Sequence, residues 1–160
     1  MELNKNLSIE ATLNPDFSQV ESDATKIDIN SPTAINYPER RPFFNRGVDA
    51  MDYQIDVFYS RSINNPSFAS KIINQGKKSR LYVLSAFDNE TPYLVPTKYE
   101  SFSGVGGESF SNVIRYQNFI NNQTKIGLLA SNRLYEGDAY GNLYGFDALI
   151  NFSDVWKFRF

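Results

Sequence analysis

The ten residues from Leu143 to Phe152, Leu-Tyr-Gly-Phe-Asp-Ala-Leu-Ile-Asn-Phe, decide the fold class of this chain. Side chains of a β-strand alternate between its two faces with a period of two residues. One face of this segment carries Tyr144, Phe146, Ala148, Ile150 and Phe152. The other face carries Leu143, Gly145, Asp147, Leu149 and Asn151. The pattern predicts a strand with one apolar face and one mixed polar face.

Similar alternation recurs along the chain. We expect further strands at 7–13, 25–30, 53–63, 80–88, 110–120, 124–135 and 155–160. In the last of them, Trp156, Phe158 and Phe160 share a face opposite Lys157 and Arg159. The sequence therefore predicts an all-β, antiparallel meander that forms a single β domain over residues 1–160.

The connections follow from prolines, glycines and polar runs. Turns are predicted at 64–66 and 74–78, and a loop at 136–142. Residues 31–52 contain three prolines and Gly47, which predicts a long irregular connection or a short helical insert. Residues 89–108 contain two prolines and a glycine-rich run, which predicts an irregular, mobile loop.

The composition excludes several classes of function. The chain has no cysteine and no histidine, so disulfides, thiolate sites and histidine-dependent catalysis are excluded. Its formal net charge of −2 gives no basic surface for nucleic acid. We expect no enzymatic activity and no cofactor. No signal peptide is recognisable at the N-terminus of this chain.

Periodicity alone leaves two architectures open. Strands of about ten residues with one apolar and one polar face are typical of an outer-membrane β-barrel, in which the apolar face contacts lipid. A soluble antiparallel sheet or sandwich turns the same apolar face towards its own core. Aromatic residues make up 15% of the chain, which suits either kind of β-sheet.

Three strings carry more specific information: Thr12-Leu-Asn-Pro-Asp-Phe-Ser-Gln-Val-Glu-Ser-Asp23, Glu39-Arg-Arg-Pro-Phe-Phe44 and Phe58-Tyr-Ser-Arg61. Together they resemble a bacterial family of unknown function, whose members carry a carbohydrate-binding (family-nine-like) module followed by an outer-membrane β-barrel. The resemblance is specific over residues 7–63, and 64–160 is similar to the barrel only in general pattern. It departs from the family at Asn45-Arg-Gly47 and Arg61-Ser-Ile-Asn64.

The resemblance implies a location and a role. It implies the bacterial outer membrane as the location and membrane lipid as the partner, with a carbohydrate or another envelope protein as further partners. Family members are several times longer, so we expect a fragment or a shortened relative that begins near the junction between module and barrel. The resulting hypothesis is a non-catalytic barrel segment, part of a barrel or a small barrel, with a structural or solute-passage role.

Two alternatives belong to other classes. The first is a soluble β-sheet module that binds a carbohydrate or a protein. The second is a glycoside hydrolase that uses a pair of carboxylates. Asp16, Glu21, Asp23 and Asp28 are close in sequence and could serve such a site or hold calcium, although their spacing matches no regular calcium loop. We expect a solvated hairpin there and no metal site.

The remaining candidate residues form a predicted docking element. A bidentate pair between an arginine and a carboxylate could fix the long connection, with Glu21 or Asp23 as the acid. In a barrel the element would be a plug. The residues assigned to it are Glu39, Arg40, Arg41, Phe43 and Phe44, and Arg61 belongs to the same signature. Five further cations in the later strands, whose faces the sequence leaves open, could line a lumen: Arg115, Lys125, Arg133, Lys157 and Arg159.

Overall fold

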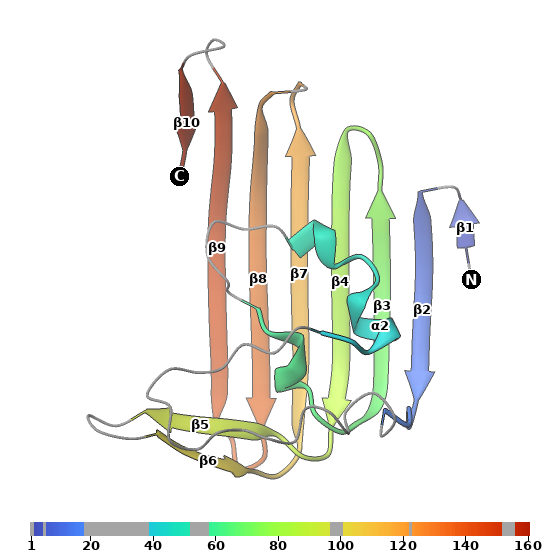
Figure 1. The fold of residues 1–160 in the computed structure, drawn as a ribbon, viewed down its shortest axis with the longest axis vertical. Coiled ribbons are helices and arrows are strands. Elements are labelled where there is room, and N and C mark those ends of the chain that lie inside the picture. Colours follow the sequence, from blue (N-terminus) through green and yellow to red (C-terminus); the bar gives the residue numbers. More distant parts are fainter. Residues whose placement is uncertain are drawn as a thin grey trace.

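The computed structural model describes residues 2–4, 6–17, 39–51, 58–96, 101–121, 123–151 and 156–160. Its main feature is one eight-stranded antiparallel sheet, with β1 at one edge and β10 at the other (Figure 1). In spatial order the strands are β1 (Glu2–Asn4), β2 (Leu7–Leu13), β3 (Pro66–Gln75), β4 (Ser79–Asp88), β7 (Ser109–Phe119), β8 (Lys125–Tyr135), β9 (Tyr140–Asn151) and β10 (Lys157–Arg159). This confirms the predicted all-β antiparallel meander.

Most strands lie where the alternation places them. β2 has the predicted bounds, and β4, β7 and β8 differ from prediction by a residue at one or both ends. β9 begins at Tyr140, inside the predicted loop, because the turn that precedes it is shorter. β10 is only three residues long. The strand expected at 25–30 lies outside the described residues.

Three stretches differ from the sequence prediction. Residues 66–75, flanked by the two predicted turns, form the full strand β3. Residues 92–105 form a hairpin of β5 (Pro92–Pro96) and β6 (Ser101–Val105), not an irregular loop. Proline is tolerated there because it begins and ends a strand of a separate two-stranded sheet.

The third difference is in the predicted strand 53–63. Ser60–Ser62 form a short 3-10 helix, η2, and residues 52–57 lie outside the described part. The backbone turns here because the amides of Ser62 and Ile63 donate to the carbonyls of Tyr59 and Ser60. The carbonyls of Ser60 and Ile63 also accept hydrogen bonds from the side chain of Arg41, not from a neighbouring strand.

A short helical connection lies across one face of the sheet, over β3, β4 and β7 (Figure 1). We call residues 39–51 and 58–65 the strap. It contains α2 (Pro42–Asn45), η1 (Val48–Met51) and η2, so the helical insert predicted near 31–52 is present over 42–51. Gly47 has a φ of +81°, and a Cβ there would lie 2.6 Å from Cδ1 of Ile73. Glycine thus allows the strap to touch β3.

The strap and the sheet enclose a small apolar core. Phe44, Ala50 and Ile63 of the strap are each at most 1% exposed. They pack against inward residues of β3, β4, β7 and β8: Ala69, Ile73, Tyr82, Leu84, Ala86, Val113 and Leu129. The face beneath the strap is called the inner face, and the opposite face the outer face.

The two faces differ in charge. The strand registers place the cations Lys71, Arg80, Arg115, Lys125, Arg133, Lys157 and Arg159 and the acids Glu10, Asp88 and Asp147 on the inner face. From β2 to β10 of the main sheet, no outward position in the described strands carries a charge. The five later cations predicted as a possible stripe therefore do share one face.

Candidate functional site: the strap on the charged inner face

Arg41 is the centre of the contact between the strap and the sheet. Its side chain is 1% exposed, although arginine is rarely buried completely. The guanidinium forms a bidentate pair with Glu39, in which Nε donates to Oε1 at 2.9 Å and Nη2 donates to Oε2 at 2.8 Å. The backbone amide of Arg41 also donates to Oε1 of Glu39, at 2.9 Å. A bidentate arginine–carboxylate pair is thus present in the predicted docking element, here between Arg41 and Glu39.

The same guanidinium holds the second part of the strap. Nη1 donates to the carbonyl of Ile63 at 2.6 Å, and Nη2 donates to the carbonyl of Ser60 at 3.0 Å. The Ser60 hydroxyl donates to Oε2 of Glu39 at 2.5 Å. Residues 39–41 and 60–63, about twenty positions apart, are thereby fixed by a single charged group.

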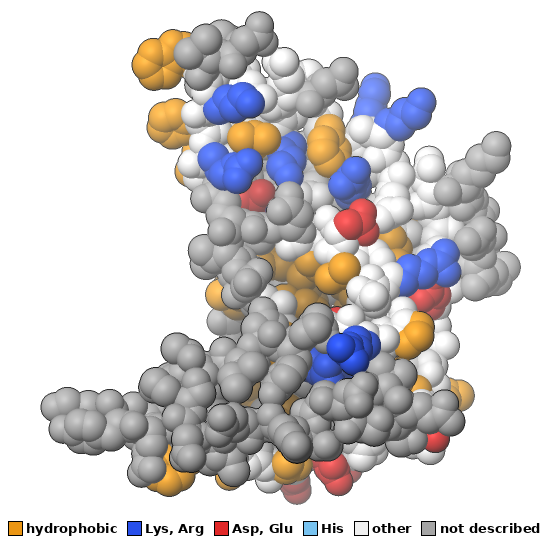
Figure 2. Space-filling view, in the orientation of Figure 1, with side chains coloured by type: hydrophobic (Ala, Val, Ile, Leu, Met, Phe, Trp, Pro, Cys, Tyr) orange, Lys and Arg blue, Asp and Glu red, His pale blue; other side chains and the backbone are white. Residues whose placement is uncertain are grey.

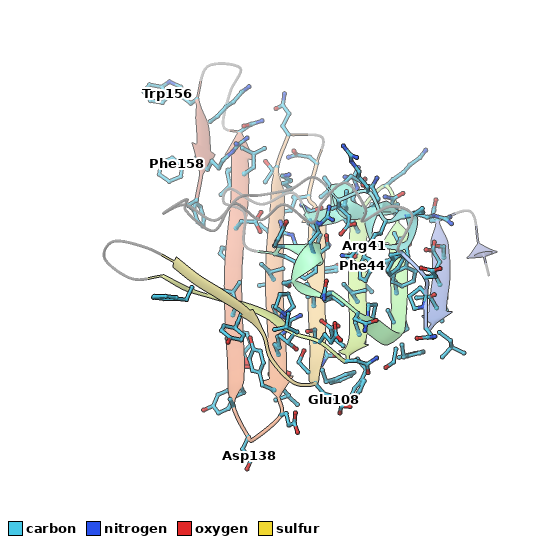
Figure 3. The ribbon with its side chains drawn as sticks, turned by 60° about the horizontal axis from the view of Figure 1, so that its bottom comes forward. Arg41, Phe44, Glu108, Asp138, Trp156 and Phe158 are labelled. Atoms are coloured by element: carbon cyan, nitrogen blue, oxygen red, sulfur yellow. The ribbon has the colours of Figure 1, made fainter. Side chains whose placement is uncertain are left out.

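Aromatic rings enclose this polar group. The guanidinium carbon of Arg41 lies 4.2 Å from the ring centroid of Phe44 and 5.2 Å from that of Phe17. The Phe43 and Phe44 rings meet edge to face at 5.1 Å. Cation–π contacts strengthen when water is excluded, as it is around Arg41. Figure 3 shows Arg41 and Phe44 together in the strap, on one side of the sheet.

The pair changes the acidity of Glu39. Burial acts to raise the pKa of its carboxyl group, but hydrogen bonds from Arg41 and Ser60 and the charge of Arg41 outweigh burial. The net result is a pKa below the ordinary value of 4.5. In the folded protein, Glu39 is therefore ionised at neutral pH.

A second buried cation, Lys71 of β3, supports α2 from below. It is 1% exposed, and its ammonium group donates to the carbonyls of Phe43 and Arg46, the latter at 2.8 Å. These carbonyls end a four-residue helix and have no intrahelical donor. Glu10 of β2 lies 3.3 Å from Lys71 and 2.8 Å from Arg46, so one carboxylate balances two cations.

A third charged pair lies on the inner face beyond the strap. Arg115 of β7 and Asp147 of β9 form a bidentate pair with distances of 2.5 and 3.0 Å across strand β8. The strand between them has Gly127 at this level, where a Cβ would lie 2.4 Å from Oδ1 of Asp147. Glycine at 127 therefore makes room for a pair that joins strands two apart.

The predicted site residues divide into three groups. Glu39, Arg41, Phe43 and Phe44 are brought together in the strap. Asp16 and Arg40 are exposed, and Arg61 lies in η2, outside the hydrogen bonds just described. Glu21 and Asp23, proposed as partners of the arginine, lie outside the described residues, as does Asp28. Their pairing with Arg41 therefore stays a prediction, and Glu39 is the partner that the described residues show.

Sequence reasoning did not single out Glu10 or Lys71, and it did not pair Arg115 with Asp147. One signal was available for Lys71: it lies in an alternating stretch between Ala69 and Ile73, at an inward position. Within the described part of the chain, no group of three carboxylate, cysteine or histidine side chains could hold a metal ion. The site described here is therefore a set of buried ion pairs.

The chain was compared with known proteins. Neither curated proteins nor solved structures gave a match. Among the described residues, no helix is long and apolar enough to cross a membrane. A family model described as a domain of unknown function (DUF5916) matches residues 2–86, which is more than half of the chain. This span includes β1 to β3, the strap and most of β4. The chain belongs to this family, DUF5916, a domain of unknown function.

Proposed function

We propose that this chain is a non-catalytic, membrane-spanning part of a bacterial outer-membrane β-barrel, with a structural or solute-passage role. The observation that carries the proposal is the inverted distribution of charge. A soluble sheet covers its apolar face and leaves its charged face in water. Here the strap covers a small apolar core on the face that carries all the charges of strands β2 to β10. The charge-free outer face has no covering element among the described residues.

The outer face carries exposed apolar side chains, as a surface in contact with lipid requires. Exposed residues on it include Ile114 at 46%, Leu128 at 55% and Phe146 at 53%. The five long strands β3, β4, β7, β8 and β9 contain 10, 10, 11, 11 and 12 residues. A transmembrane β-strand needs about 9–11 residues, so each is long enough to cross.

Aromatic residues mark both ends of the outer face. At one end Phe68, Phe87 and Phe110 are direct neighbours on adjacent strands, and the same row continues through Leu134 to Tyr140. At the other end Trp156 and Phe158 lie at the edge strand β10 (Figure 3). Aromatic girdles at the two membrane interfaces are typical of transmembrane barrels.

The outer face also contains a row of serine and asparagine side chains, which satisfy one another. The Ser85 hydroxyl donates to Oδ1 of Asn112 at 2.8 Å, and Nδ2 of Asn132 donates to Oδ1 of Asn142 at 2.6 Å. Polar groups in hydrocarbon are costly unless they are hydrogen-bonded. Such cross-strand pairs fit a lipid-facing position.

The proposed barrel requires closure beyond the pairing described here. The described strands form an open sheet, because no pairing joins β1 to β10. In the proposal, further strands extend the sheet at both edges, where the short strands β1 and β10 leave most of β2 and β9 unpaired in the described part of the chain. The inner face with its strap then lines the lumen. A carbohydrate or another envelope protein as additional partner stays a prediction.

The single tryptophan provides a direct test. Trp156 is 74% exposed. We expect vesicles of brominated phosphatidylcholine to quench its fluorescence, and the folded protein to change its gel mobility on heating. Ile114→Lys places a charge in the middle of the outer face and should reduce insertion strongly, since lysine there costs about 2–4 kcal/mol. Gln75→Lys, on the inner face, is the matched control and should insert normally.

Two results would reject the membrane proposal. One is a monomer that is stable in buffer without detergent and whose Trp156 fluorescence does not change with vesicles. The other is an Ile114→Lys variant that inserts as well as Gln75→Lys, because an exposed position on an ordinary soluble sheet should tolerate either lysine. These results would favour the soluble binding module.

A further inference from the structure

The two ends of the sheet differ in charge, although Arg133 lies near the acidic end. The end where β3, β7 and β9 finish is called the basic end, and it carries Lys77, Lys78, Arg80, Lys125, Lys157 and Arg159. The opposite end carries Asp88, Glu90, Glu108, Glu136 and Asp138. Figure 2 shows most blue side chains in the upper part of this face, with some red ones among them, and further red ones at its lower edge. Figure 3 shows Glu108 and Asp138 at the end opposite Trp156.

Four of the basic-end cations share the inner face. Lys125 and Arg159 are both direct neighbours of Leu149, one on each side, so their backbones are about 10 Å apart. Lys157 follows on the same side of β10 as Arg159. Arg80 is the direct neighbour of Gln117 on the same face. This arrangement surrounds a patch of sheet with cations from three of its strands.

The nearby acids are already engaged. Asp147 is held by both terminal nitrogens of Arg115. Asp49 of the strap accepts hydrogen bonds from Nε2 of Gln75 at 3.0 and 3.1 Å. Asp147 is thus neutralised by Arg115, whereas Asp49 keeps its charge but is held beside Gln75 of β3, away from β8 and β10. The cations of the patch therefore attract anions.

A second observation concerns two side-chain oxygens at different sides of this patch, one on β7 and one on β9. Gln117 is 1% exposed, yet its side-chain oxygen has no hydrogen-bond partner. The side-chain oxygen of Asn151, the direct neighbour of Lys157, also has none. Buried amide oxygens are almost always satisfied, so a donor is expected beside each. Both oxygens lie on the inner face, next to cations.

A phosphate group meets both requirements. Its negative oxygen atoms accept from lysine and arginine, and its singly protonated form has an O–H that can donate to an amide oxygen. We propose that the inner face at the basic end binds phosphate-bearing solutes, through Arg80, Lys125, Lys157 and Arg159. This inference rests on the proposed function, in which the same face lines the lumen.

Inorganic pyrophosphate, titrated calorimetrically into the protein in dodecyl maltoside, tests the proposal without a phosphate-containing lipid. We expect saturable binding that weakens with salt, because the attraction is electrostatic. The double variant Lys157→Gln/Arg159→Gln should lose affinity about tenfold. The control Lys77→Gln/Lys78→Gln removes two charges from the turn at the same end, outside the patch, and should lose less than about threefold.

The double variant changes two of the three residues of β10 and could disturb that strand, so a further variant tests the patch elsewhere. Lys125→Gln, in the long strand β8, should also weaken pyrophosphate binding by several-fold while the circular dichroism spectrum is unchanged. Absence of saturable binding, or equal losses in both double variants, would overturn the proposal. Vesicle insertion is measured separately with Trp156, so a protein that inserts without binding pyrophosphate contradicts only this inference. A protein that binds pyrophosphate but fails to insert contradicts only the membrane proposal.

Discussion

Replacing Arg41 with alanine should release the strap. The substitution removes the guanidinium donors from the carbonyls of Ser60 and Ile63 and from the carboxylate of Glu39. The carboxylate keeps only the Ser60 hydroxyl and the backbone amide of residue 41. Each buried polar group left unsatisfied costs about 1–3 kcal/mol. Breaking a buried ion pair by removing one partner costs about 3–5 kcal/mol, and we take this value for the whole group. The cation–π contacts with Phe44 and Phe17 add to the same loss.

Limited trypsin digestion measures this loss at the strap itself. Arg46 has a side chain that is 54% exposed, and it follows α2 directly. Cleavage after Arg46 requires local opening of the strap, and its rate follows the population of the open form. A loss of about 3 kcal/mol should therefore raise the rate of this cleavage by at least about a hundredfold.

Arg40→Ala is the matched control, because it removes the neighbouring arginine, which is exposed. Both variants keep the cleavage site after Arg46. We expect Arg40→Ala to be cleaved within about threefold of the unmodified protein, as is usual for surface substitutions. If Arg41→Ala and Arg40→Ala are cleaved at the same rate, the strap is held by something other than the buried guanidinium, and the reasoning fails.

Two further predictions concern the other charged pairs. The pKa of Glu39 is lowered in the folded protein, so the stability it contributes is present above about pH 4.5 and is lost as the pH falls through the folded pKa. The difference in melting temperature between the unmodified protein and Glu39→Gln should thus narrow from pH 7 to pH 3, and a gap independent of pH would contradict this. Gly127→Ala should lower the melting temperature by on the order of 10 °C, since its Cβ would lie 2.4 Å from Asp147 and 2.6 Å from Arg115. The control Gly141→Ala has no atom within 4 Å of its Cβ and should melt normally; equal losses would show that the ion pair is not the cause.

The sequence carries the fold class because alternation is a local property. Residues 143–152 assign each side chain to one of two faces without reference to any other strand, and the register with β8 agrees with that assignment. The same holds for Lys157 and Arg159, which share the face opposite Phe158 as the alternation predicts. The hairpin β5–β6 was not predicted, because the prolines and glycines of this short segment indicated a loop and its alternation was too brief to indicate strands.

The candidate site was only partly predictable. The string from Glu39 to Phe44 identified the residues of the docking element, since a double arginine beside paired phenylalanines has no role in ordinary alternation. The partner of Arg41 could not be identified in the same way. The sequence offers several carboxylates near Arg41, and its pairing with Glu39 depends on where α2 and η2 lie on the sheet.

The sequence by itself determined that this protein is an antiparallel meander whose strands have one apolar and one polar face, because a period of two residues is written into each strand separately. Only the tertiary structure decided which face is covered. The strap lies on the face that carries Lys71 and Glu10: Arg46 pairs with Glu10, and two strap carbonyls accept from Lys71. Its long-range hydrogen bonds join residues from 19 to 71 positions apart, and such contacts depend on the folded arrangement of the strands.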